Sequence, residues 1–201
     1  MKIVVIGASG TIGKAVAEAL APRHEVVRAS RSGAVAADIE DAGSIERLFA
    51  SVKDVDAVVC CAGSAAFKPL AKLEDADFAM SLRSKLLGQV NLVRTAMRHL
   101  RDGGSITLTS GVLAREPAPG GAAISLVNAA IEGFVGAAAL ELPRRLRVNV
   151  VSPPWIAETL VALKMDPRLG IPAAVAARAY VAAVEGTATG ATIDARAHAR
   201  G

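Results

Sequence analysis

Aromatic side chains are scarce in this 201-residue chain, which has four Phe, one Tyr and one Trp, or 3% of its residues. So few rings cannot form the stacking platforms on which single-stranded nucleic acids bind. The 23 Lys and Arg residues exceed the 19 Asp and Glu residues by a net charge of only +4, and they are scattered along the chain. We therefore expect no nucleic-acid partner.

Cysteine is also scarce, because only Cys60 and Cys61 are present and they are adjacent. Neighbouring residues rarely reach disulfide geometry without strain, and no second cysteine pair or histidine cluster stands nearby to complete a zinc site. No metal site is predicted. The start MKIVVIGASG lacks the longer apolar region and the cleavage site of a secretory signal, so we expect a cytoplasmic protein.

Long apolar runs are few, and the longest extends from Ala122 to Leu142. Its length raises the question of a membrane span. Asn128, Glu132 and Glu141 interrupt it, so a buried helix is the better interpretation and no membrane partner is expected.

Short β-branched runs alternate with helical stretches along the whole chain, which shows no repeat and no linker-like segment. This alternation predicts a parallel sheet covered on both faces. The fold class is therefore predicted to be α/β, a Rossmann-type doubly wound sheet in three αβα layers, with residues 1–201 as a single domain. The expected strands are Lys2–Ile6, His24–Ala29, Val35–Asp38, Ala57–Cys60, Ser105–Thr109, Arg147–Val151 and Thr192–Asp194. The expected helices are Thr11–Leu20, Ser44–Ser51, Asp75–Leu100, Gly121–Leu142 and Pro172–Val184, with a proline-interrupted loop before the last one.

The first expected strand runs directly into the glycine loop Gly7-Ala8-Ser9-Gly10-Thr11-Ile12-Gly13 and then into a helix. Glycines at such a junction permit a tight turn and let backbone N–H groups approach a pyrophosphate at the helix N-terminus. A dinucleotide-binding loop is the functional interpretation. A glycine-rich turn without a ligand is the alternative.

With this loop and several later motifs, the chain resembles the short-chain dehydrogenase/reductase family. The loop has the GxxGxxG spacing of that family's extended and atypical members. The later matches are Asp38-Ile39, Cys61-Ala62-Gly63 in place of an NAG motif, Ser110 at a strand end, AAIEGF over 129–134 and RVNVVSPPW over 147–155. The resemblance implies a nicotinamide cofactor bound by Gly7, Ser9, Gly10, Thr11, Ile12, Gly13, Asp38, Ile39, Cys61, Ala62, Gly63, Pro153 and Trp155.

The end of the second strand bears on the type of cofactor. An acid there usually accepts the ribose 2′-hydroxyl of NAD, whereas a basic residue suits the 2′-phosphate of NADP. This chain has Arg31 and Ser32 there and no acid, so NADP(H) is favoured over NAD(H). An ordinary solvated arginine is the alternative.

The catalytic residues of the family are incompletely matched. The resemblance implies a proton-donating tyrosine, a lysine four residues later and a serine that hydrogen-bonds the substrate oxygen, for which Ser110 is the candidate. Alignment on the 129–134 stretch puts Ile124 at the tyrosine position and Asn128 at the lysine position. Isoleucine has no proton to give and asparagine carries no charge. The only tyrosine, Tyr180, falls in a late helix and is expected to pack in the core.

The family's fourth active-site residue, an asparagine before the fifth strand, aligns with Lys85. We hypothesise an exchange of positions with Asn128, in which Lys85 restores a cation near the nicotinamide ribose. Alternatively, Lys85 is a solvated helix residue. Glu116 is a further candidate proton donor, and an exposed loop position is its alternative.

These observations favour an NADP(H)-binding protein of this fold with weak or no dehydrogenase activity of the usual kind. An NADP-dependent oxidoreductase with a non-standard proton donor is the alternative, and a structural oligomer that has lost the cofactor is a third.

The segment from Trp155 to Pro172 is short, which predicts an open site for an unknown small-molecule substrate. The apolar helix predicts a homodimer or homotetramer, and the tail Ala195–Gly201 is expected to fray.

Overall fold

The computed structural model describes residues 1–199, which form a seven-stranded sheet in the order β3-β2-β1-β4-β5-β6-β7. All neighbouring strands are parallel. The strands are β1 (Lys2–Ile6), β2 (Glu25–Ser30), β3 (Val35–Ala36), β4 (Ala57–Cys60), β5 (Ser105–Thr109), β6 (Arg147–Ser152) and β7 (Thr192–Asp194). The chain begins in an inner strand and winds outward in both directions, which confirms the predicted doubly wound α/β fold.

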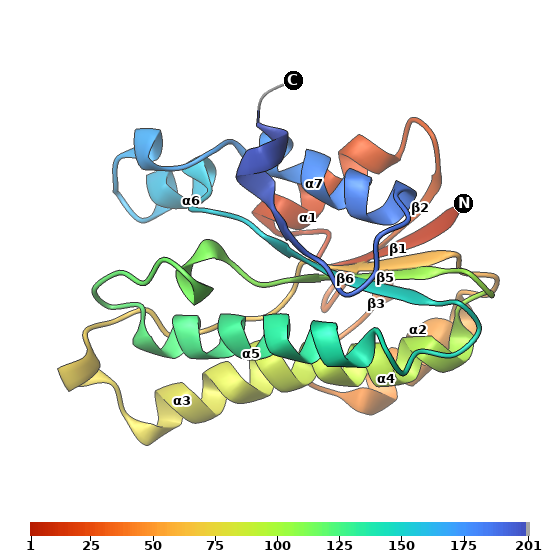
Figure 1. Ribbon diagram of the computed structural model, residues 1–201, viewed down its shortest axis with the longest axis horizontal. Helices are drawn as coiled ribbons and strands as arrows, with labels where there is room; N and C mark the ends of the chain where they lie inside the picture. Colours follow the sequence, from red (N-terminus) through yellow and green to blue (C-terminus); the bar gives the residue numbers. More distant parts are fainter. Residues whose placement is uncertain (200–201) are drawn as a thin grey trace.

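Helices cover both faces of the sheet (Figure 1). One layer holds α1 (Thr11–Leu20) and α7 (Ala173–Glu185), with α6 (Ala157–Ala162) beside them. The other holds α2 (Ala42–Ser51), α3 (Asp75–Ser81), α4 (Gly88–His99) and α5 (Ala122–Ala138). Successive strand residues point to opposite faces, so Ile3 and Val5 pack towards α1 and α7, while Val4 and Ile6 pack towards the other layer.

The helix predicted over Asp75–Leu100 exists, but it is not uniform. A π-helical segment, Leu82–Leu87, separates α3 from α4. Such segments insert an extra residue into a helical turn and are frequent at functional sites. The hydrophobic period alone gave no signal for it.

Two predicted loop regions are more ordered than expected. The proline-interrupted segment contains α6 and a 3₁₀ turn at Pro167–Leu169. The tail forms a second 3₁₀ turn at Ala195–His198, where Ala195 is fully buried among residues of α7. The expectation of a fraying tail is therefore wrong as far as residue 199, and residues 200–201 lie outside the described part of the chain.

Strands β4 and β5 separate at their carboxyl ends. Their pairing stops at Val59 and Thr107, whereas β5 continues beside β6 as far as Thr109. Because the strands are parallel, the loops that follow β1, β4 and β5 emerge at the same edge of the sheet, where ligands bind in folds of this kind. Among the described residues, no helix is both long enough and apolar enough to cross a membrane, and the predicted apolar stretch forms the helix α5.

Candidate functional site

The glycine loop is a compact turn between β1 and α1. Gly7 has φ +81°, a conformation that favours glycine, and its N–H donates to the backbone oxygen of Ala29 at 2.9 Å. A Cβ on Gly13 would lie 2.1 Å from the backbone oxygen of Gly7, so α1 can approach the loop this closely only with glycine there. No side chain in the described structure caps α1 at Gly10. The N–H groups of its first turn are therefore available to an anion.

An outer cavity of about 280 Å³ opens beside this loop. Nine of the predicted cofactor residues line it: Gly7, Ser9, Gly10, Arg31, Asp38, Ile39, Cys61, Ala62 and Gly63. Ser30, Ala37, Glu40, Ser64 and Ser84 complete the lining and were not among the predicted site residues. The predicted residues Thr11, Gly13 and Ser32 line neither this cavity nor the inner one described below. Ser30 rather than Ser32 is thus the hydroxyl beside Arg31.

The two carboxylates of the outer cavity already accept hydrogen bonds from nearby groups. Arg83 donates to Glu40 at 2.9 Å, and this hydrogen bond is the largest cause that lowers the pKa of Glu40; Arg31 contributes weakly. Asp38 accepts from the N–H of Glu40 at 3.0 Å. The exposed Arg31 is the cation of this lining, and two acids, Asp38 and Glu40, line the same cavity.

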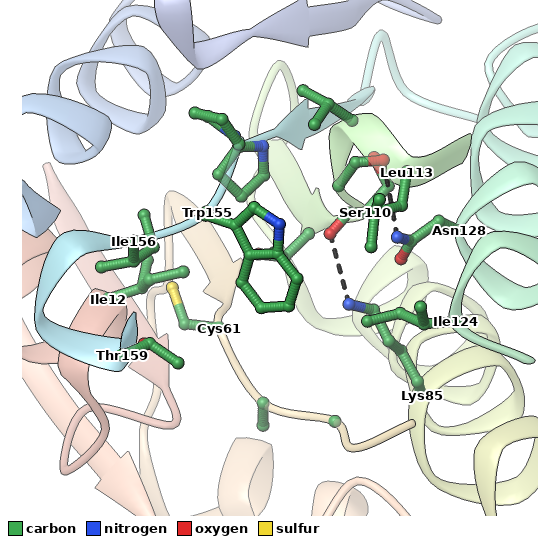
Figure 2. Close-up of a pocket in the computed structure, with 17 residues that line it drawn as sticks. Ile12, Cys61, Lys85, Ser110, Leu113, Ile124, Asn128, Trp155, Ile156 and Thr159 are labelled. Carbon is green, nitrogen blue, oxygen red and sulfur yellow. Dashed lines mark hydrogen bonds between the residues drawn. The ribbon is translucent and has the colours of Figure 1, made fainter. Parts of the chain in front are cut away.

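An inner cavity of about 260 Å³ continues from the outer one, because Cys61, Ala62 and Gly63 line both. Its walls come from the loops after β4, β5 and β6 and from α5 (Figure 2). The remaining lining residues are Ile12, Lys85, Thr109, Ser110, Gly111, Val112, Leu113, Ile124, Asn128, Pro153, Pro154, Trp155, Ile156 and Thr159. The two cavities together form one groove from the glycine loop to α5.

Lys85 supplies the ammonium group of the inner cavity. It stands in the π-helical segment, and its Nζ donates to the backbone oxygen of Ser110 at 3.2 Å, as Figure 2 shows. Burial lowers the pKa of Lys85 to about 8, while the neighbouring Cys60 acts weakly in the opposite direction. Lys85 is therefore not a solvated helix residue, which was the alternative considered from the sequence.

Ser110 does not present its hydroxyl to the cavity as the sequence predicted. Its Oγ donates to Glu132 Oε1 at 2.8 Å, and a longer contact of 3.5 Å reaches the backbone oxygen of Val151. Glu132 in turn lies 3.7 Å from the guanidinium of Arg115. The hydroxyl is thus bound in a network behind the cavity wall, and only the backbone of Ser110 faces Lys85.

Gly111, the next residue, stands where a side chain would face the cavity. A Cβ there would lie 2.9 Å from Nδ2 of Asn128, so the amide occupies that space. Asn128 is 1% exposed, and its Nδ2 makes a long contact of 3.5 Å with the backbone oxygen of Gly111. Its Oδ1 has no hydrogen-bond partner among the described residues. Ile124, one turn earlier in α5, adds an apolar side chain to the same wall.

Gln89 is a structural residue of the site that sequence reasoning missed. Its Nε2 donates to the backbone oxygens of Lys85 at 3.1 Å and Thr109 at 2.9 Å, and its Oε1 accepts from the N–H of Thr109 at 2.8 Å. The side chain therefore pairs with β5 just beyond the point where β4 departs. A glutamine four residues after Lys85 was the only available clue, and it is a weak one.

Three other polar candidates are excluded from proton transfer by their surroundings. Tyr180 is fully buried and its hydroxyl pairs with Thr109 Oγ1 at 2.9 Å, which confirms the expected packing role. Glu116 forms an ion pair with Arg196 at 2.6 Å, and that partner lowers the pKa of Glu116, which leaves it a poor acid. Burial raises the pKa of the Cys61 thiol, so this residue stays protonated at neutral pH.

Comparison with known proteins identifies the family. A family model described as Enoyl-(Acyl carrier protein) reductase matches residues 4–183. A hydroxynaphthalene reductase-like protein from Metarhizium brunneum is 31% identical over 176 residues, which cover 75% of this chain and 66% of that protein. An uncharacterized oxidoreductase of Methylorubrum extorquens is 30% identical over 178 residues, 76% of this chain and 72% of its own length. The chain belongs to the short-chain dehydrogenase/reductase family.

Solved structures of similar proteins match nearly the whole chain. A protein from Listeria innocua is 41% identical with a TM-score of 0.92, covering 96% of this chain and 98% of that one. A small-chain dehydrogenase in complex with NADPH is 29% identical with a TM-score of 0.83, covering 96% and 95%. This chain spans 66% of the length of the Metarhizium brunneum relative. Short-chain dehydrogenases bind nicotinamide cofactors, and the groove described above lies where such a cofactor enters a doubly wound sheet.

Proposed function

We propose that this short-chain dehydrogenase-like protein binds NADP(H) in the groove and has weak or no dehydrogenase activity of the family's usual kind. The observation that carries the proposal is the groove itself. It begins at the uncapped N-terminus of α1 and ends at a cavity in which α5 contributes Ile124 and Asn128.

The outer part of the groove fits a dinucleotide. The glycine loop leaves backbone N–H groups at a helix N-terminus open to a pyrophosphate, and Gly7 and Gly13 leave no side chain in the way. Asp38 and Ile39 line the far end, where the family resemblance puts the adenine. The solved NADPH complex of a similar dehydrogenase supports the same ligand class.

The preference for NADP(H) over NAD(H) rests on Arg31. Its guanidinium stands exposed at the rim of the outer cavity beside Ser30, and both groups can hydrogen-bond a 2′-phosphate. Two acids line the same cavity. Glu40 pairs with Arg83, and Asp38 accepts from the N–H of Glu40. Arg31 is the cation in this lining that can meet a 2′-phosphate.

The inner part of the groove does not support the family's usual proton transfer. At the alignment position of the tyrosine stands Ile124, and at that of the lysine stands Asn128, 1% exposed and close to Gly111. Neither side chain carries an acidic proton at neutral pH. Ser110, the remaining member, directs its hydroxyl to Glu132.

A second function is favoured by one specific observation, the Lys85 ammonium in the inner cavity. It is the candidate for a non-standard proton donor, which would make the protein an NADP-dependent oxidoreductase of the carbonyl reductase or alcohol dehydrogenase type. The substrate would be a small molecule.

The double substitution Ile124→Tyr with Asn128→Lys tests whether only the usual donor pair is missing. We expect the double variant to reduce 4-nitrobenzaldehyde with NADPH faster than wild type, while NADPH affinity is unchanged. Ile124→Phe with Asn128→Lys is the matched control, since it adds the ring without the hydroxyl. A wild type that already reduces the aldehyde as fast as the double variant would contradict the proposal.

We further propose a homodimer or homotetramer formed through α5. The outer face of this helix exposes apolar and small residues at helical spacing, among them Leu126, Ala129 and Gly133. Small residues let two helices approach closely, and an exposed leucine beside them adds apolar area.

The free thiols of Cys60 and Cys61 fit a reducing compartment, which supports the cytoplasmic expectation.

A further inference from the structure

We propose that Lys85 is the proton donor of this site and that it protonates the oxygen of a small aldehyde or ketone in the inner cavity. The inference rests on the second function above, the NADP-dependent oxidoreductase. It gives Lys85 a different role from a fixed cation near the ribose, because a fixed cation keeps its proton.

The side chain of Lys85 lies where a ligand in the inner cavity can meet it. Lys85 enters the inner cavity from the π-helical segment, opposite Trp155 and on the side of Ile124 (Figure 2). Among the described residues, Lys85 Nζ makes one hydrogen bond, to the backbone oxygen of Ser110, and an ammonium has three N–H groups. The others remain available to a ligand in the cavity.

The backbone of Lys85 is held by its neighbours on two sides. Gly63 has φ +121°, and a Cβ on it would lie 3.0 Å from Cα of Lys85, so the loop after β4 packs directly on this turn. Gln89 holds the backbone oxygen of Lys85 at 3.1 Å and ties it to β5. A donor held from two sides needs little reorganisation to reach a bound carbonyl.

The groups around Lys85 determine how readily its ammonium gives up a proton. The thiol of Cys60 lies on the β4 side and Asn128 on the α5 side, and the pKa of Cys60 is raised to about 12 by burial, so it stays neutral. Glu132, a carboxylate behind the cavity wall, accepts from the hydroxyl of Ser110 and lies 3.7 Å from the guanidinium of Arg115. No carboxylate lines the inner cavity within the described residues. The ammonium is therefore desolvated without a counter-ion, which lowers its pKa to about 8 and makes it an acid suited to neutral pH.

The unpartnered Oδ1 of Asn128 completes the site. A buried acceptor without a donor is costly, so a ligand that brings a hydroxyl group is favoured. The alcohol formed by reduction brings such a group. The product, rather than the carbonyl substrate, thus satisfies both Asn128 and the amine of Lys85.

In the proposed step, a reduced nicotinamide bound in the groove would supply the hydride. Its addition to the carbonyl carbon moves the C=O π electron pair onto oxygen, and the Nζ–H bond of Lys85 breaks as its proton passes to that oxygen. The products are an alcohol, an oxidised nicotinamide and a neutral lysine amine, which regains a proton from water.

The first experiment measures the proton of Lys85 without any turnover. Trace acetylation with acetic anhydride between pH 6 and 11, followed by peptide mass spectrometry, reports the titration of each lysine. We expect the reactivity of Lys85 to rise through a midpoint near pH 8, lower than the midpoints of the exposed references Lys53 and Lys72 in the same digest. A midpoint of Lys85 that coincides with theirs would overturn the proposal.

The second experiment separates a donated proton from a fixed charge. Wild type, Lys85→Arg and Lys85→Met are assayed for NADPH oxidation with cyclohexanone and 4-nitrobenzaldehyde, with Lys72→Met as the control outside both cavities. We expect turnover by Lys85→Arg and Lys85→Met to fall about 100-fold, since a general acid contributes on that order. Turnover by wild type should fall as pH rises through 8.

Each outcome of this assay decides a different claim. Rescue by Lys85→Arg would assign Lys85 the fixed-cation role and overturn proton donation. If wild type binds NADPH but reduces neither carbonyl, proton donation is overturned and NADP(H) binding stands. If NADPH does not bind at all, the proposed function fails as well.

Discussion

The ammonium of Lys85 donates a hydrogen bond to the backbone oxygen of Ser110 at a distance of 3.2 Å. The cation of this site therefore comes from the π-helical segment before α4, whereas the family resemblance implies a lysine at the position of Asn128 on α5. The two residues line the same cavity, as the hypothesis of exchanged positions requires. What the exchange does for cofactor or substrate stays a proposal that the following predictions test.

Replacement of Gly13 by alanine is expected to weaken cofactor binding. The added Cβ would lie 2.1 Å from the backbone oxygen of Gly7, so either the loop or α1 must shift. We expect NADPH affinity to fall at least about tenfold and stability to fall by about 1–3 kcal/mol, the usual cost of overpacking.

Gly136→Ala is the matched control for Gly13→Ala, because a Cβ on Gly136 meets nothing within 4 Å. This change should stabilise α5 by up to about 1 kcal/mol and leave NADPH affinity unchanged. Isothermal titration calorimetry and urea unfolding measure both quantities. Wild-type NADPH affinity in Gly13→Ala would show that the loop does not carry the pyrophosphate.

Removal of the Arg31 guanidinium is expected to erase the preference for NADPH. A charge-assisted hydrogen bond contributes about 1.5–3 kcal/mol, so Arg31→Ala should weaken NADPH binding by roughly 10- to 100-fold and leave NADH binding unchanged. Arg28→Ala, an exposed position in β2 that lines neither cavity, is the control. Equal loss of both nucleotides in Arg31→Ala would show that Arg31 supports the fold or the adenine instead.

The free energy of unfolding should depend on pH through the ionisation of Lys85. In the folded state its pKa is lowered to about 8 from the ordinary 10.5, so between these values the unfolded chain holds more protons and stability rises with pH. Relative to Lys85→Met, wild type should therefore gain about 2 kcal/mol of unfolding free energy between pH 7 and pH 10. Urea unfolding at both pH values measures this difference. If the difference in unfolding free energy between wild type and Lys85→Met stayed constant with pH, the ammonium would not be desolvated.

A charge on the outer face of α5 is expected to dissociate the proposed oligomer. Leu126 is 46% exposed in the single chain and lies on the outer, apolar face of α5. Leu126→Asp should give a monomer in sedimentation velocity, whereas Leu140→Asp, which follows the helix and is 89% exposed, should leave assembly unchanged. A wild type that sediments as a monomer would contradict the oligomer directly.

Much of the fold was predictable because its signals are local. The alternation of β-branched runs and helical stretches predicted all seven strands, with ends that differ from the structure by at most two residues. The glycine loop predicted the cofactor end of the groove, because a strand, a tight turn and a helix follow in that order. The apolar stretch predicted a helix over Gly121–Leu142, and α5 occupies Ala122–Ala138 of it.

The inner site was predictable only in part, because its geometry depends on side-chain directions. Ser110 and Gly111 are neighbours in the chain, and which of them faces the cavity depends on how the end of β5 is held. The hydrogen bonds that fix the end of β5 come from Gln89, and their partner Thr109 lies 20 residues away in the chain. The lowered pKa of Lys85 likewise arises from burial by distant loops, which no local pattern encodes.

The most direct test of the central claim is a fluorescence titration of the wild-type protein with NADPH and, in parallel, with NADH. The account predicts micromolar binding of NADPH and binding of NADH that is weaker by at least about tenfold, because only NADPH offers a phosphate to Arg31. Binding of neither nucleotide would contradict the account, since the groove would then be a feature of the fold without its ligand.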